Sequence, residues 1–150
     1  MTVRYSGAIS RIVVMNSVFI GVLMVLGLCT SLLEPTKAPL VFLITVVMGL
    51  LMTWKAHDES QKLINKIPVK WVGDIWKTRG QVRRSLIGNA MTFVIAAIVM
   101  CVMLPVSIHR GDFGTVTGCV VAMVFWVGIM ITDALIVTRG VTFHLRDHEK

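Results

Sequence analysis

The stretch that decides the fold is the first long apolar run, residues 12–33, which reads IVVMNSVFIGVLMVLGLCTSLL. It carries no charge and exceeds the roughly 20 apolar residues that a helix needs to cross the hydrocarbon core of a bilayer. Backbone polar groups must be satisfied inside lipid, so the run is expected to be helical. Three further apolar runs follow, at residues 39–54, 85–108 and 115–138. We therefore predict an all-α membrane protein with four transmembrane helices in a single domain, residues 1–150.

The second run is the shortest of these, and a re-entrant hairpin is the alternative to a full span there. Composition agrees with the membrane class, because 55% of the residues are hydrophobic and the mean hydropathy is +0.79. A soluble domain is excluded on these grounds.

The net charge of +7 could by itself indicate nucleic-acid binding, but the charge is distributed as a topology signal. Of the 15 Lys and Arg residues, only Lys37 and Arg110 lie in the turns after the first and third runs. Basic residues accumulate on the cytoplasmic side of membrane proteins. We therefore predict a bacterial inner-membrane protein with both termini in the cytoplasm, and no nucleic-acid partner.

This topology gives two helical hairpins joined by a long basic cytoplasmic segment, residues 55–84. Its apolar residues form one stripe on a helical wheel, edged by lysines, which is typical of a helix lying in the headgroup layer and held by anionic lipid. A docking site for a partner protein is the alternative interpretation. The residues expected to meet the membrane surface or the partner are Lys62, Lys66, Lys70, Trp71 and Trp76.

Three polar residues inside the spans, Asn16, Asn89 and Asp133, each lie five or six residues from the arginine that marks the boundary of their span. A rise of 1.5 Å per residue places all three about 7–9 Å below the interface. Such residues usually face a bundle interior or a wet cavity. Two interpretations remain open. Asp133 is either held by the asparagines or by a boundary arginine, fixing helix register, or it is a protonatable transport site.

Small residues recur at four-residue spacing along the last run, at Gly114, Gly118 and Ala122. This spacing lets helices approach closely. It predicts a packing surface, either within the bundle or between protomers.

The sequence contains no C-x-x-C pair and no evident nucleophile–base pair. We predict no cofactor, no metal site and no enzymatic activity. The favoured function is contact with another membrane protein or with further copies of the chain, as an accessory or assembly subunit or an exclusion/immunity-type protein. The alternative is a small oligomeric secondary transporter or channel that uses Asp133 as its ion or proton site.

Overall fold

The computed structural model describes residues 2–66 and 72–146, and all regular structure in these ranges is helical. The helices are α1 (Thr2–Leu33), a short 3-10 turn η1 (Pro35–Lys37), α2 (Ala38–Ile64), α3 (Val72–Ile98), a π-helical turn η3 (Val99–Met103), α4 (Leu104–Arg110) and α5 (Phe113–Arg146).

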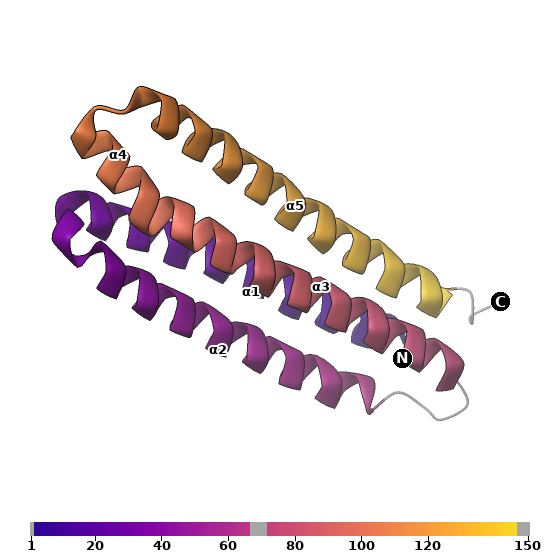
Figure 1. The fold of residues 1–150 in the computed structure, drawn as a ribbon. Coiled ribbons are helices and arrows are strands. Elements are labelled where there is room, and N and C mark those ends of the chain that lie inside the picture. Colours follow the sequence, from indigo (N-terminus) through magenta and orange to yellow (C-terminus); the bar gives the residue numbers. More distant parts are fainter. Residues whose placement is uncertain (1, 67–71, 147–150) are drawn as a thin grey trace.

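The helices form an elongated bundle in which α1, α2, the continuous run from α3 to α4, and α5 run antiparallel in turn (Figure 1). α1 packs against α2, α2 against α3 and α3 against α5, and α5 closes the ring by packing against α1. Both termini lie at the same end of the bundle as the last turn of α2 and the first turn of α3. The two tight turns, after α1 and after α4, lie at the opposite end.

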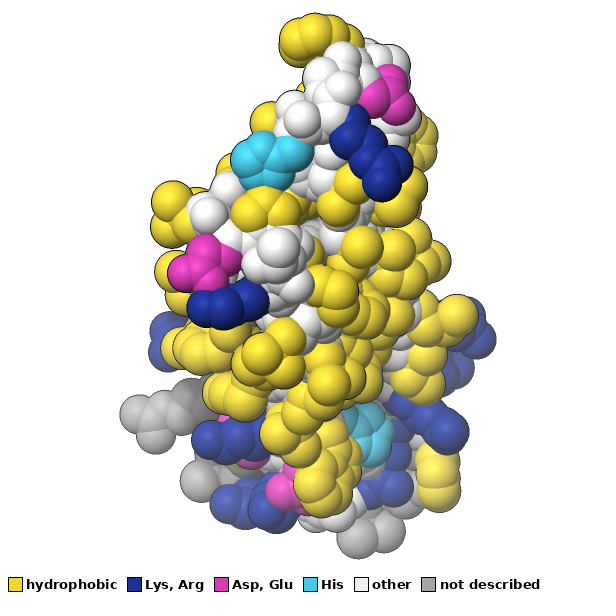
Figure 2. All heavy atoms as spheres, turned by 60° about the vertical axis from the view of Figure 1, so that its left-hand side comes forward, with side chains coloured by type: hydrophobic (Ala, Val, Ile, Leu, Met, Phe, Trp, Pro, Cys, Tyr) yellow, Lys and Arg dark blue, Asp and Glu magenta, His cyan; other side chains and the backbone are white. Residues whose placement is uncertain are grey.

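Four helical stretches are long and apolar enough to cross a membrane, with mean hydropathies between 1.8 and 2.5. The prediction of an all-helical chain with four candidate membrane spans is therefore confirmed. Figure 2 shows the matching surface, in which hydrophobic side chains form a broad band and Lys and Arg side chains gather at the lower end of the view. The four stretches are Ala8–Leu33, Pro35–Ile64, Trp76–Arg110 and Phe113–Arg139.

The second helix is longer than the sequence predicts. The predicted span ends at position 54, whereas α2 continues to Ile64. Its charged residues in this extension pair along the helix surface, Lys55 with Glu59 at 3.9 Å and Lys62 with Asp58 at 2.5 Å. Side chains one turn apart can pair in this way without interrupting a helix. At 27 residues α2 is long enough for a full span, so the re-entrant alternative is not needed.

The segment 55–84, predicted as one connecting element, is divided between the ends of α2 and α3. Ile64, from its apolar stripe, is fully buried in the bundle, and Leu63 packs against the same cluster. This part of the stripe therefore faces the other helices and not the headgroup layer. Lys70 and Trp71 lie outside the described residues.

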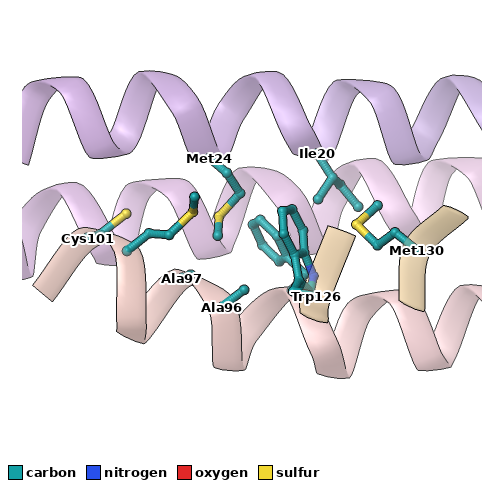
Figure 3. Packing of buried hydrophobic residues seen from close by; sticks show 9 residues of the cluster. Ile20, Met24, Ala96, Ala97, Cys101, Trp126 and Met130 are labelled. Carbon is teal, nitrogen blue, oxygen red and sulfur yellow. The ribbon is translucent and has the colours of Figure 1, made fainter. Parts of the chain in front are cut away.

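The described side chains form two apolar clusters in the interior, one near the end that carries the termini and one further along the bundle. Figure 3 shows the second, where the Trp126 side chain from α5 lies among residues of the other helices. The buried members of the first cluster are Ile9, Val13, Ala56, Ile64, Val82, Leu86 and Val137. Those of the second are Ile20, Met24, Phe93, Ala96, Ala97, Met100, Cys101, Trp126 and Met130.

The third span contains Pro105, and its helical geometry changes just before that residue. A proline has no amide hydrogen, and its ring crowds the carbonyl four residues earlier. Here the π-helical turn η3 precedes it, and the amide of Leu104 donates to the carbonyl oxygen of Val99. The wider turn accommodates the proline within one continuous span.

The turn between α4 and α5 is defined by Gly111 and Asp112. Gly111 has a φ of 68°, the left-handed conformation that glycine adopts at helix ends. The amide and hydroxyl of Thr115 donate to the Asp112 carboxylate at 3.2 and 2.6 Å. Asp112 therefore caps the first turn of α5. The hydroxyl and then the amide of Thr115, by binding the charged form, lower the pKa of Asp112.

This cap predicts a loss of stability in acid. A carboxyl group with a lowered folded-state pKa stabilises the fold above its unfolded pKa, about 3.9, and the stabilisation is lost as the pH falls through the folded-state value. Asp112→Ala should therefore lower the thermal unfolding midpoint at neutral pH, and its difference from wild type should shrink below about pH 4. Melting curves of both proteins across this range test the cap, which a pH-independent difference would contradict.

Candidate functional site

One buried polar residue that links two helices is Asn89, on α3. It is fully buried, and its Nδ2 donates to the Ser17 hydroxyl of α1 at 3.1 Å. Ser17 in turn donates to the carbonyl oxygen of Val13 at 3.1 Å. Along α1, Ser17 lies between the residues of the first apolar cluster and those of the second, and Asn89 has the same position along α3. Asn89 therefore contributes a polar interhelical contact at this level, and Ser17, which the sequence did not single out, is its partner.

Asn16, the neighbour of Ser17, lies on a different side of α1. It is 6% exposed and lines a hollow of about 200 Å³ between α1 and α2, together with Lys55 and Glu59. Among the described residues, its Nδ2 has no hydrogen-bond partner. Asn16 therefore faces α2.

Asp133 lies on α5 at the edge of α3. Its Oδ2 is 3.4 Å from where a Cβ on Gly88 would be. It also lines a surface hollow of about 430 Å³ whose other lining residues, such as Phe125 and Ile129, all come from α5. Within residues 2–66 and 72–146, no hydrogen bond or ion pair joins Asp133 to Asn16 or Asn89. The three predicted residues therefore lie at similar levels but on different sides of the bundle.

The small residues of α5 face outward. Gly114, Gly118 and Ala122 are all exposed, and a Cβ at Gly118 would meet no atom within 4 Å. The predicted packing surface is therefore exposed and not buried against another helix of the bundle. Of the two interpretations of this surface, contact between chains is the one that stays open.

The small residues that bring helices together lie mainly on α2, with Gly27 on α1, and sequence reasoning missed them. A Cβ at Gly49 would lie 2.2 Å from Cε1 of Phe93, so α2 and α3 approach closely there. The signal was present, because small residues recur about every fourth position along this helix. The buried small residues of α2 are Ala38, Thr45, Gly49, Thr53, Ala56 and Ser60.

The basic end of the bundle is held together around Arg79. Its guanidinium donates to Oδ1 of Asn65 and lies 5.3 Å from the ring centroid of Trp76. Trp76 is 64% exposed, and Lys62 and Lys66 are exposed as well. The described members of the predicted surface group therefore remain accessible at one end of the molecule.

Within the described ranges, no three His, Cys, Asp or Glu side chains lie close enough together to hold a metal ion. No family model, curated protein or solved structure matches this chain. The outward face of α5, with Asp133 at its edge, is the candidate functional site, since it combines close-packing residues with an acid inside a span.

Proposed function

We propose that this chain is a non-enzymatic bacterial inner-membrane protein that acts through contact of its helices with another membrane protein. Its class is an accessory or assembly subunit, or an exclusion/immunity-type protein. The observation that carries the proposal is the exposed stripe of Gly114, Gly118 and Ala122 on α5.

Small residues matter here because lipid is as apolar as a leucine side chain, so helices associate in membranes mainly through close packing and polar contacts. The outward face of α5 would let a second helix approach its backbone. Both α2 and α5 expose large apolar side chains, such as Leu43 on α2 and Phe125 on α5. The outward face of α2 differs in that it has no exposed glycine or alanine among them. This contrast supports α2 as a lipid-facing helix and α5 as the contact helix.

Asp133 supports the same face. A helical rotation of 100° per residue brings it close in angle to Ala122 and Ile129. An acid at this depth is costly unless it finds a partner. A hydrogen-bond donor or basic side chain on a neighbouring helix would satisfy it, so a membrane-protein partner or a second copy would complete the site.

The proposed orientation has both termini and the basic end of the bundle in the cytoplasm. It rests on the distribution of Lys and Arg between the two ends. In this orientation Lys62, Lys66 and Trp76 would meet the cytoplasmic leaflet, where anionic lipids attract basic side chains. We propose the same contact with the cytoplasmic leaflet for Lys70 and Trp71.

The alternative, a transporter or channel that uses Asp133, would have to place its pathway between protomers. The axis of one bundle is filled by large side chains, including Phe93, Met24 and Trp126. Flux through proteoliposomes of the purified chain, abolished by Asp133→Asn, would favour this alternative over the accessory function.

The contact face can be tested by cross-linking in cells. A photoreactive residue at Val121 on α5 should give an adduct with a larger membrane protein, whereas one at Leu43 on α2 should give far less. These positions form a matched pair, since each is 57% exposed. Adducts with the chain itself alone would assign the face to homo-oligomer formation. Equal yields at both positions would contradict the proposal.

A substitution tests the same face. Gly118→Leu fills the space that a partner helix would occupy, so recovery of the partner with the purified chain should fall about tenfold, or about 1.4 kcal/mol. Gly80→Leu is the control, because a Cβ at Gly80 also meets no atom within 4 Å and lies outside this face. Unchanged recovery with Gly118→Leu would contradict the proposal.

A further inference from the structure

A continuous apolar groove runs between α1 and α5, on a different side of α5 from the stripe of small residues. It consists of two adjoining hollows, of about 360 and 440 Å³, which share Val18, Gly21, Trp126 and Val127 as lining residues. A Cβ at Gly21 would meet no atom within 4 Å, so the glycine leaves the groove open at its middle. Each hollow is large enough to hold part of a small apolar ligand.

The groove has the length of a lipid chain. On α1 its lining extends from Val14 to Leu26. That separation is about 18 Å at 1.5 Å per residue, close to the roughly 15 Å of hydrocarbon in one leaflet. A transmembrane helix, about 10 Å across, would not fit between two helices that already contact each other.

Positive charge lies at one end of the groove. There the Ser10 and Thr138 hydroxyls form a hydrogen bond of 2.9 Å between α1 and α5. The next residues along the two helices, Arg11 and Arg139, are both exposed. Among the described side chains, no ion pair involves either arginine, whereas Asp58 and Glu59 pair with lysines of their own helix, α2. A phosphate group at this end would meet two available guanidinium groups.

We propose that this groove binds an anionic phospholipid of the leaflet on the side of the termini. One acyl chain lies along Val14, Gly21 and Trp126, and the phosphate meets Arg11 and Arg139. The proposal is independent of the contact made by the outward face of α5, because it uses a different surface.

Trp126 provides the readout, because it lines both hollows. In the full chain with its other three tryptophans, Trp54, Trp71 and Trp76, replaced by Phe, fluorescence comes from Trp126 alone. Reconstitution into phosphatidylcholine vesicles that contain phosphatidylglycerol with brominated acyl chains should quench this fluorescence. The same mole fraction of brominated phosphatidylcholine should quench it less. Equal quenching by the two lipids would overturn the proposed headgroup selectivity.

Two variants separate the parts of the site. Gly21→Leu should fill the groove and remove the difference between the two lipids, whereas the control Gly80→Leu should keep it. Arg11→Gln leaves the packing in place and should lower the preference for phosphatidylglycerol roughly fivefold. Persistence of the full preference in Gly21→Leu would overturn the groove as the binding site, and its persistence in Arg11→Gln would overturn the phosphate contact. Melting curves check that each variant is folded.

Discussion

Replacing Gly49 with alanine should destabilise the bundle by about 2–3 kcal/mol, the upper part of the range for overpacked cores. The added Cβ would lie 2.2 Å from Cε1 and 2.3 Å from Cζ of Phe93. Real carbon atoms do not approach so closely, so either the ring or the helix has to move.

Phe93 has little room to move, because its side chain is fully buried in the second apolar cluster. Interiors are packed at crystal-like density, and displacement of the ring would disturb its neighbours. If α2 moved away from the ring instead, its buried face would lose contact with α3. Both responses weaken the same helix pair.

Reversible unfolding in mixed micelles measures this loss. Gly128→Ala is the matched control, because Gly128 also lies in a span and a Cβ there meets no atom within 4 Å. It should be neutral or slightly stabilising, as alanine favours helix more than glycine does. Adding Phe93→Leu to Gly49→Ala should cost less than the sum of the single changes. A Gly49→Ala variant as stable as Gly128→Ala would show that the α2–α3 contact is looser than described.

The four helices could be predicted from the sequence, because apolar length alone indicates them. Their ends were less predictable. The expected end of the second span was set at Lys55, the first charge, yet α2 continues because its charges pair on the surface while Ala56 and Ser60 continue the buried face. A charge marks where a helix can leave lipid, and it does not mark where the helix ends.

The contacts agree with the expected common level of the candidate residues along the bundle, but the direction in which each residue faces could not be predicted. Asn16, Asn89 and Asp133 were expected to share one level, and their helices do bring similar levels together. However, periodicity within one helix does not determine which helix its polar face meets. Asn89 therefore contacts Ser17, while Asp133 lies against Gly88.

The small-residue stripes illustrate the same limit. The stripes on α2 and α5 have similar spacing, and only the arrangement of the four helices decides which of them is buried. Gly49 on α2 lies against Phe93, whereas Gly118 on α5 remains open. A stripe of small residues that is not packed against another helix of the bundle is available to a partner. For this reason we assign the contact face to α5.

Replacing Trp126 with alanine is the second change with a large expected effect, a loss of about 2–3 kcal/mol of stability. Trp126 is 5% exposed and lies among Ile20, Met24 and Met130 (Figure 3). In water, truncating a buried tryptophan costs about 3–5 kcal/mol, which includes the transfer of apolar atoms out of water. That transfer contributes little when lipid is the solvent, so mainly the lost packing and the cavity remain.

Trp126→Phe should cost less than half as much. Within the described ranges the indole Nε1 is buried without a hydrogen-bond partner, so its removal breaks no bond. Phe125→Ala is the control, because this adjacent side chain is 71% exposed and should contribute only about 0.5 kcal/mol. Unfolding in mixed micelles compares the three variants. Equal losses of stability in Phe125→Ala and Trp126→Ala would mean that both rings face lipid. That result would contradict the packing of Trp126 inside the bundle.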